Sequence, residues 1–588
     1  MSTAILTGPP VAGSQLEGDL EALGYQVVVT DGDDLTTRVA AVPAGERLAL
    51  VDPRLVAHRH ALRLALTDPR FDVSALPGLL RVEPVRRAAL APARGATPDE
   101  LAAAIEASGV PVQRPDLGVL VARVPADADE RAAAQAAADG VDEERVRLNS
   151  VVKARDGFFT TFFISPFSRY IARWCARRGL TPNQVTTASL ITALIAAGCA
   201  ATGTRGGYAA AGVLLLLSFV LDCTDGQLAR YSLQYSTLGA WLDATFDRAK
   251  EYAYYAGLAL GAARGGDDVW ALALAAMVLQ TCRHVVDFSF NEANHDATAN
   301  TSPTAALSDR LDSVGWTVWA RRMIVLPIGE RWAMIAVLTA FTTPRVVFYA
   351  LLVGCSLAAC YTTAGRVLRS LTRRARRTDR AAGALADLAD SGALAEGWAK
   401  VLAEPARRLP GFTAPAVAAL GTAVIIVTAA LAPVHGPWPL VAAIACTASS
   451  GLAVARPLKG ALDWLVPPFF RAAEYTTILV LAARSASDGA LPAAFGLVAA
   501  VAYHHYDTVY RIRGGTGAPP HRLVLAIGGH EGRVLVVTAA ALVLHSTGFT
   551  IALTAFAAAL ALTVLIESIR FWVSSGAPAV HDESGEPA

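Results

Sequence analysis

The sequence has few charged residues, and those of opposite sign nearly cancel. Asp, Glu, Lys and Arg make up 17% of the 588 residues, and the formal net charge is +1 at pH 7. A balance so close to zero gives no general attraction to nucleic acid, so we expect no nucleic-acid partner. Hydrophobic residues make up 54% of the chain. This composition is too apolar for a soluble protein and indicates a polytopic membrane protein with polar appendages.

The sequence also lacks cysteines at metal-ligand spacing and a signal peptide at its start. The seven cysteines lie mostly in apolar segments, and none has the spacing of metal ligands. We therefore interpret them as small buried hydrophobic residues and not as disulfides or zinc ligands. The first ten residues, MSTAILTGPP, lack the charged start and long apolar run of a signal peptide.

Residues 221–252 place four carboxylates in otherwise apolar, helix-forming sequence and are the strongest candidate for a functional site. Their sequence is LDCTDGQLARYSLQYSTLGAWLDATFDRAKEY. Asp222 and Asp225 are three residues apart and Asp243 and Asp247 are four apart, so each pair lies on one face of its helix. An unpaired carboxylate at membrane depth costs roughly 2.5–3.5 kcal/mol, and we therefore expect the pairs to face each other across a polar site. Carboxylate oxygens suit Mg²⁺ or Mn²⁺ better than zinc.

Small residues and one arginine flank these carboxylates. Gly226 lets a bulky ligand approach the first helix, and Gly239 allows the second helix to come close to it. Arg230 lies two helical turns after the first aspartate, where it can reach a phosphate or hold a carboxylate. The alternative from another class is a membrane transporter or scaffold whose aspartates bind cations without turnover.

The whole spacing, Asp222-x2-Asp225-Gly226-x2-Ala229-Arg230-x8-Gly239-x3-Asp243-x3-Asp247, matches every fixed position of a known signature. The segment resembles the CDP-alcohol phosphotransferase (CDP-alcohol phosphatidyltransferase) family. The resemblance implies a six-helix membrane enzyme that moves a phosphate-linked alcohol from a CDP-alcohol to an acceptor hydroxyl and releases CMP. Donors such as CDP-diacylglycerol or CDP-inositol would place it in phospholipid or inositol-phosphate biosynthesis.

The resemblance also implies roles for individual residues. Asp222, Asp225 and Asp243 would hold Mg²⁺ or Mn²⁺ on the CDP diphosphate. Asp247 would be a further metal ligand and the general base. The CDP moiety would contact Asp222, Gly226, Ala229, Arg230 and Gly239. Two metals and a carboxylate base are what displacement at a diphosphate phosphorus needs.

Acceptor residues are harder to identify. Arg248, beside the expected base, and Arg331 are the preferred candidates for an acceptor phosphate. Arg321 and Arg322 are equally well explained by the positive-inside rule.

Hydropathy predicts six spans in a catalytic domain over 184–368, at 184–203, 207–225, 240–263, 268–290, 327–342 and 344–368. Basic clusters lie before the first span and after the sixth. An even number of spans with two basic ends places both ends in the cytoplasm. The active site and the N-terminal domain would then also face the cytoplasm. We expect the membrane to be a bacterial inner membrane. Before these spans, residues 146–183 read as an interfacial amphipathic segment in which Arg169, Arg173 and Arg177 alternate with aromatic residues.

Residues 1–145 read as a soluble α/β domain with a mostly parallel sheet, in which short apolar runs such as AILTG, YQVVVTD, RLALVD and GVLVARV alternate with amphipathic helices. The turn at 7–13 is the place where such a fold often binds a phosphate. The domain resembles, weakly, the cytidylyltransferase domain that some family members carry. A Gly-rich loop with a basic residue is missing, and the first basic residue is Arg38. We therefore expect an inactive, nucleotidyltransferase-like domain kept for docking or regulation.

The rest of the chain divides into a charged helical linker at 369–410, a second membrane domain at 411–575 with about six more spans, and a disordered tail at 576–588. The second membrane domain looks like a degenerate repeat of the first. WLDATFDRAKEY from Trp241 aligns without a gap with WLVPPFFRAAEY from Trp464, and valine and phenylalanine replace the two aspartates. We therefore expect an internal pseudo-dimer, with a homodimer as the alternative. The motif HHYDTVYRIR, residues 504–513, lacks metal-ligand spacing and is interpreted as anchoring a loop.

Overall fold

The computed structural model describes residues 2–30, 34–90, 97–153, 156–297, 323–372 and 375–574. The chain separates into two compact units, which are described individually below. One unit contains residues 1–154, 167–182 and 224–236, and the other contains residues 155–166, 183–223 and 237–588.

The N-terminal domain is an α/β domain built on a five-stranded sheet with the order β2-β1-β3-β6-β5. Strand β1 pairs in parallel with β2 and β3, whereas β3–β6 and β6–β5 are antiparallel. The expectation of a mostly parallel sheet was therefore wrong for its second half. The strands are β1 (Ser2–Leu6), β2 (Tyr25–Val29), β3 (Arg47–Val51), β5 (Val73–Leu76) and β6 (Leu79–Val82).

A tight turn accounts for this difference. Strands β5 and β6 are joined by Pro77 and Gly78, and Gly78 has a φ of +75°, which only glycine adopts without strain. The resulting hairpin adds two antiparallel strands to the edge of the parallel part. The run at 118–124, which was expected to be a full strand, contributes only β7 (Ala122–Arg123), paired with β4 (Val56–Ala57) outside the main sheet.

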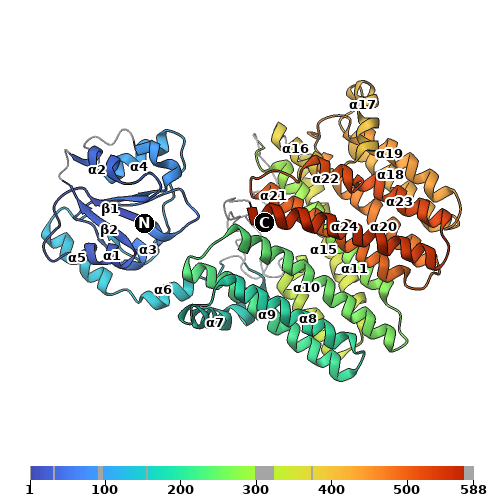
Figure 1. The fold of residues 1–588 in the computed structure, drawn as a ribbon, viewed down its shortest axis with the longest axis horizontal. Helices are drawn as coiled ribbons and strands as arrows, with labels where there is room; N and C mark the ends of the chain where they lie inside the picture. Colours follow the sequence, from blue (N-terminus) through green and yellow to red (C-terminus); the bar gives the residue numbers. More distant parts are fainter. Residues whose placement is uncertain are drawn as a thin grey trace. The chain divides into compact units, whose positions relative to one another are not determined.

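Helices cover both faces of the sheet (Figure 1). Because strand side chains alternate between faces, Ala4 and Leu6 of β1 join a core with α1 and α3, while Ile5 joins a second core with α2 and α4. The helices of this domain are α1 (Leu16–Ala22), α2 (Leu35–Ala41), α3 (Arg59–Thr67), α4 (Pro98–Ala107), α5 (Ala128–Asp139) and α6 (Glu143–Ser150).

The same unit contains α7 (Ser165–Arg177) and the end of α9 (Arg205–Ser232). Helix α7 exposes a row of aromatic side chains, with Phe167 67%, Tyr170 45% and Trp174 53% exposed. Arginines at 169, 173 and 177 follow the same helix. This pattern is typical of a helix that lies at a membrane surface. The interfacial location stays a prediction.

The second unit is helical. Six helices occupy the positions predicted for the first six spans, and six longer helices follow in the second membrane region. The first set is α8 (Pro182–Ala201), α9, α10 (Thr237–Arg264), α11 (Trp270–Asn294), α14 (Ile328–Phe341) and α15 (Pro344–Thr372). The second set is α18 (Thr413–Leu431), α19 (Trp438–Val454), α20 (Val466–Arg484), α21 (Ala490–Arg513), α23 (Gly529–Val543) and α24 (Thr547–Ser574), with the short α22 (His521–Ala526) before α23.

Seven helical segments in the described chain are long and apolar enough to cross a membrane. They are Pro182–Ala201, Arg205–Ser232, Trp270–Asn294, Pro344–Thr372, Thr413–Leu431, His521–Val543 and Thr547–Ser574. The protein is therefore a multi-pass membrane protein. The larger number of spans expected from the sequence stays a prediction, because α10, α20 and α21 carry several charged residues.

Two contacts in this unit position the helices that matter below. Helix α10 crosses α8 where Gly257 and Gly261 face the backbone of Ala197 and Ala200, so closely that an added Cβ would overlap their carbonyl oxygens. Helix α11 packs against α20 and α21, and α10 packs against α21 and α24. The two sets of helices therefore share one apolar core.

The expected linker at 369–410 is helical, with α16 (Asp379–Ala389) and α17 (Ala393–Arg407). Helix α16 packs against α11, α20 and α21, and α17 packs against α19 and α23. Asp390, which ends α16 with a φ of +51°, is 3% exposed. The segment is thus part of the folded second unit.

Candidate active site

The predicted aspartates meet between α9 and α10. One carboxylate oxygen from each of Asp222, Asp225 and Asp243 lies within 4.8 Å of the other two. Asp225 is buried, Asp222 is partly buried and Asp243 is exposed. The cluster therefore includes one carboxylate shielded from solvent, Asp225, and one that solvent and ligands can reach, Asp243. Three carboxylate oxygens at this separation fit a hard divalent cation such as Mg²⁺ or Mn²⁺.

Asp247 lies one helical turn further along α10 and has a different partner. Its carboxylate forms an ion pair with Lys250 Nζ at 2.9 Å. Asp222 forms an ion pair with the same ammonium group. Lys250 thus neutralises two of the four aspartates.

The sequence shows Lys250 as one of several basic residues after Asp247, but its pairing with the two aspartates was not predicted. It is 0% exposed, its Nζ donates to Ser189 Oγ of α8 at 3.2 Å, and it lies 5.6 Å from the ring centroid of Trp332. The signal was available, because Lys250 follows Asp247 by three residues and so shares its helix face. A fully buried lysine without anionic partners would be strongly destabilising, and here the aspartates supply them.

The residues assigned to the CDP moiety lie on the same two helices. An ideal Cβ on Gly226 would meet only the guanidinium of Arg230, at 3.5 Å, so the surface of α9 is open at this point. Arg230 Nε donates to the carbonyl oxygen of Val151 at 2.7 Å. Ala229 lies on α9 and Gly239 on α10. Their contacts with CDP stay predictions.

Both preferred acceptor arginines contact one glutamate. Arg248 Nη1 donates to Glu251 Oε2 at 2.8 Å, and Arg331 of α14 pairs with Glu251 at 3.3 Å. Arg331 is 7% exposed and Glu251 3%. This triad holds α10 to α14, and the acceptor role of either arginine stays a prediction. Arg321 and Arg322 lie outside the described residues.

A similar triad occurs in the second membrane region. Arg471 of α20 pairs with Glu474 at 3.0 Å, and Arg533 of α23 pairs with the same Glu474. Both arginines also pair with the buried Asp390, at 3.0 and 2.6 Å. The metal-type acidic cluster has no counterpart here among the described residues. Instead the ring of Phe470 stacks on His530, with 4.2 Å between the ring centroids.

The comparisons with known proteins agree with the carboxylate geometry. Residues 179–353 match the family model described as CDP-alcohol phosphatidyltransferase. The match supports, for this part of the chain, the resemblance to the CDP-alcohol phosphatidyltransferase family that the aspartate spacing indicates. Residues 379–588 match a second model, described as a family of unknown function (DUF5941).

Curated relatives match shorter stretches of the chain. The chain is 34% identical over 124 residues to a phosphatidylinositol phosphate synthase of Streptomyces avermitilis, covering 21% of this chain and 47% of that protein. It is 41% identical over 83 residues to a bifunctional IPC transferase and DIPP synthase of Rubrobacter xylanophilus, covering 14% and 18%. It is 34% identical over 91 residues to an archaetidylinositol phosphate synthase of Pyrococcus horikoshii, covering 16% and 47%. The chain thus spans about half or less of the length of these relatives.

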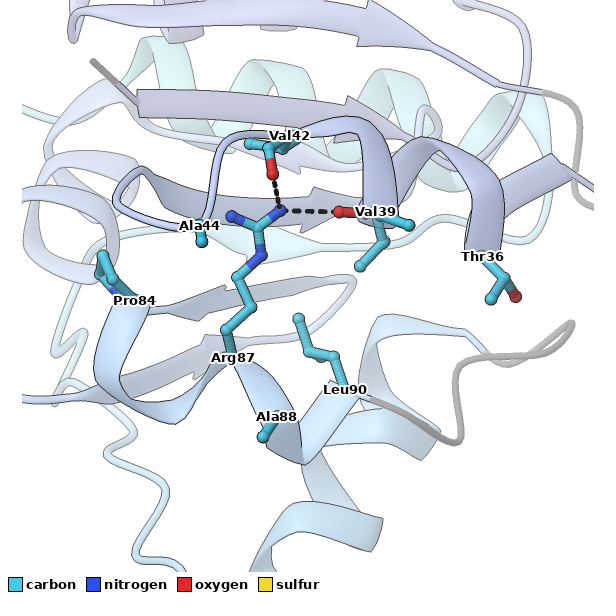
Figure 2. Close-up of a pocket in the computed structure, with 9 residues that line it drawn as sticks. Thr36, Val39, Val42, Ala44, Pro84, Arg87, Ala88 and Leu90 are labelled. Carbon is cyan, nitrogen blue, oxygen red and sulfur yellow. Dashed lines mark hydrogen bonds between the residues drawn. The ribbon is translucent and has the colours of Figure 1, made fainter.

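The described residues form at least two cavities. A cavity of about 350 Å³ lies in the N-terminal domain between α2 and the 3₁₀ segment Pro84–Leu90, away from the turn at 7–13 (Figure 2). Arg87 lines it and donates to the carbonyl oxygens of Val39 and Val42, at 2.7 and 2.8 Å. Because the guanidinium is bound to the end of α2, this arginine stabilises the domain, and nucleotide binding by the domain stays a prediction.

The other cavity has a volume of about 80 Å³ and is lined by Asp243 and Trp241 of α10 together with Tyr510 and Trp572 of the second membrane region. It is smaller, but it contains a member of the acidic cluster. The sequence analysis did not foresee it, because the residues that form it are separated by more than 260 positions.

Proposed function

We propose that this protein transfers a phosphate-linked alcohol from a CDP-alcohol donor, such as CDP-diacylglycerol or CDP-inositol, to an acceptor hydroxyl and releases CMP. The observation that carries the proposal is the cluster of Asp222, Asp225 and Asp243, within 4.8 Å on α9 and α10, inside the segment that matches the family model. The names of the relatives support a product in phospholipid or inositol-phosphate synthesis.

The residues divide the reaction between them. Asp222, Asp225 and Asp243 would hold Mg²⁺ or Mn²⁺, which when bound supplies positive charge for the diphosphate of the donor. Asp247 accepts the proton of the acceptor hydroxyl at a carboxylate oxygen. Lys250 Nζ, paired with both Asp222 and Asp247, fixes the position of that carboxylate relative to the acidic cluster. The pair Arg331–Glu251 keeps α10 against α14 during turnover.

We also propose that the active site and the N-terminal domain face the cytoplasm of a bacterial cell. The support is the run of arginines on α7, whose exposed aromatic face suits the membrane surface. CDP-linked donors are made in the cytoplasm, so this orientation gives the site access to them. The N-terminal domain would then serve for docking or regulation.

The second membrane region is proposed to be a degenerate repeat that forms an internal pseudo-dimer with the catalytic half. Support comes from matched ion pairs, since Arg248–Glu251–Arg331 corresponds to Arg471–Glu474–Arg533 in the aligned segments.

Two similar contacts of nearby glutamates also support the proposal. Glu330 accepts a hydrogen bond from the amide of Phe159 at 3.3 Å. Glu531 accepts from the amides of Gly392 and Ala395 at 3.0 Å each. When Arg331 is aligned with Arg533, the two glutamates lie two residues and one residue before Arg533 and Arg331, respectively, and both accept hydrogen bonds from main-chain amides.

The test is CMP release by the purified full-length protein in detergent with Mn²⁺. CDP-diacylglycerol and CDP-inositol are each offered with inositol 1-phosphate and glycerol 3-phosphate. We expect release with one donor, and at least a hundredfold loss of kcat in Asp247→Asn because the proton acceptor is removed. Asp488→Asn, an exposed aspartate of the second region, is the matched control and should keep wild-type activity. A transporter or scaffold would release no CMP in any arm.

A further inference from the structure

The second membrane region contributes side chains to the cavity beside the acidic cluster. Thr237, Trp241 and Asp243 line the cavity from α10, and Tyr510 of α21 and Trp572 of α24 close it from the other side. All of these residues belong to one compact unit. A region that has lost the metal-type aspartates therefore still forms part of the surroundings of Asp243.

Trp572 is held in place by a buried polar network. Its Nε1 donates to Asp507 Oδ1 at 2.7 Å, and Ser568 Oγ donates to the same carboxylate oxygen at 2.7 Å. Arg511 pairs with Asp507 at 2.9 Å and with Glu567 at 2.6 Å. Asp507 is 2% exposed and Arg511 1%. Asp507 therefore anchors an indole ring, where the sequence suggested only that its motif anchors a loop.

The anchored ring meets the catalytic half. Trp572 stacks on Trp241, with 6.2 Å between the ring centroids and 20° between the ring planes. Trp241 precedes Asp243 by two residues, so this aromatic pair lies next to the acidic cluster. A buried ionic network contributes little net stability. Here the network fixes the position of the Trp572 ring, which lines one side of the cavity.

The lining suits a small polyhydroxylated group. Indole and phenol rings offer flat apolar faces to C–H groups, while Asp243 and the hydroxyl group of Thr237 can hydrogen-bond to hydroxyls. A cavity of about 80 Å³ has room for only a handful of water-sized groups, so a whole nucleotide or acyl chain does not fit. A polyol presents both apolar C–H faces and hydroxyl groups within this size range.

We propose that Trp572 and Tyr510 of the second region, together with Trp241, form a subsite that binds the polyol portion of a substrate beside Asp243. The inference rests on the proposed function and deepens it. The polyol could enter as the free acceptor or as the alcohol of the donor. In both cases the second region determines substrate affinity, although it has no acidic cluster of its own among the described residues.

The test compares wild type with Trp572→Ala, Trp572→Phe and Tyr510→Phe, using full-length protein in detergent with Mn²⁺. Trp438→Ala is the matched control, because Trp438 lies in the same region, is 61% exposed and is remote from the cavity lining. Two readouts are taken: the KM for each substrate, and the inositol 1-phosphate concentration that gives half-maximal thermal stabilisation. The second readout needs no turnover.

We expect Trp572→Ala to raise the KM for the polyol-bearing substrate and the half-stabilising concentration at least tenfold, with kcat and the Mn²⁺ requirement within threefold of wild type. Trp572→Phe keeps a ring but loses the hydrogen bond to Asp507. Its KM and half-stabilising concentration should lie between those of wild type and Trp572→Ala. If the KM for inositol 1-phosphate rises when CDP-diacylglycerol is the donor, the polyol in the subsite is the acceptor. If the KM for CDP-inositol rises instead, the polyol in the subsite is the alcohol of the donor.

The outcomes separate this inference from the proposed function. If wild type releases CMP and Trp572→Ala matches Trp438→Ala in both readouts, the subsite is refuted and the proposed function stands. If wild type releases no CMP, the proposed function fails, and the stabilisation readout still decides whether a polyol binds at Trp572. A loss of kcat with unchanged KM would also overturn the subsite, because it would show a structural effect on the acidic cluster.

Discussion

At the scale of single residues, the charge balance of the candidate site depends on Lys250. Its ammonium group contacts Asp222 and Asp247 and is shielded from solvent. Without it, the partly buried carboxylates of Asp222 and Asp247 would lose the ammonium group that pairs with both when no divalent cation is bound. We therefore expect the stability of α10 without Lys250 to depend on whether a divalent cation is bound to the acidic cluster.

We expect Lys250→Met to lower the free energy of unfolding by about 3 kcal/mol in metal-free buffer, since breaking a buried pair leaves uncompensated charge. Saturating Mn²⁺ should restore part of this loss, because the cation neutralises the same carboxylates. The measurement is thermal unfolding in detergent with and without Mn²⁺. Lys459→Met is the control. It removes an exposed pair with Asp379, 41% and 94% exposed, and should cost no more than about 1 kcal/mol. Equal losses in the two variants would contradict the account.

A second prediction concerns pH and the N-terminal domain. His60 on α3 is 4% exposed, and burial, aided by the nearby Arg63 and Arg147, lowers the pKa of His60 to about 3 from 6.5. The unfolded chain binds a proton below pH 6.5 and the folded domain does not, so stability is full above pH 6.5 and falls towards pH 3. Between pH 7.5 and 5.0 the loss should reach up to about 2 kcal/mol.

Pulse proteolysis of the full-length protein in urea, scored on N-terminal fragments, measures this dependence. His60→Leu removes the titrating group and should flatten the curve between pH 7.5 and 5.0. A variant with the same slope as wild type would show that another group causes the dependence.

The sequence predicted the acidic cluster well, because helical spacing alone decides which faces carry Asp222, Asp225 and Asp243. It could not predict Trp572 as a neighbour of Trp241, because that contact depends on how α24 packs against α10. Arg248 and Arg331 show a related limit. Their basic character was evident, and three-residue spacing could have indicated the pair Arg248–Glu251. That Arg331 shares this glutamate could be found only from the packing of α10 and α14.

At the scale of helices and strands, the apolar runs predicted the positions of six helices that the structure describes in the family region, since a membrane span requires a long uninterrupted helix. The sheet of the N-terminal domain was less predictable. The alternation of strands and helices indicated parallel pairing, but the Pro77-Gly78 turn forms a hairpin and makes β5 and β6 antiparallel. A Pro-Gly pair between two short apolar runs was the available signal.

The close crossing of α8 and α10 should be sensitive to side-chain volume. A Cβ at Gly261 would overlap the carbonyl oxygen of Ala200, whereas a Cβ at Gly198 of α8 would meet nothing within 4 Å. We expect Gly261→Ala to destabilise the protein by about 1–3 kcal/mol through overpacking and to lower CMP release, because α10 carries Asp243 and Asp247. Gly198→Ala should be neutral or slightly stabilising. Thermal unfolding and CMP release of the two variants check this, and equal behaviour would contradict the crossing.

At the scale of the whole molecule, the proposed repeat pairs helices α8–α15 with α18–α24. The second set has an ion triad that resembles the triad of the first, and it lacks the acidic cluster in the described chain. Helices α11 and α10 pack on α20 and α21. Under the proposed pseudo-dimer, these contacts take the place of a second copy.

We therefore expect one chain per particle in detergent, corresponding to 61.4 kDa of protein, because the surface that a partner would use is covered by the second region. Light scattering coupled to size exclusion measures the protein mass independently of bound detergent. An obligate dimer that cross-links through α10 or α11 would contradict the pseudo-dimer and favour the homodimer.

The central claim is that the acidic cluster on α9 and α10 catalyses transfer from a CDP-alcohol. The most direct measurement is the ratio of CMP released to phosphodiester product formed by the purified protein with Mn²⁺, CDP-diacylglycerol or CDP-inositol, and inositol 1-phosphate. The account predicts one product molecule for each CMP, both lost in Asp247→Asn and kept in Asp488→Asn. Absence of CMP with every donor, or CMP released without a phosphodiester product, would contradict it.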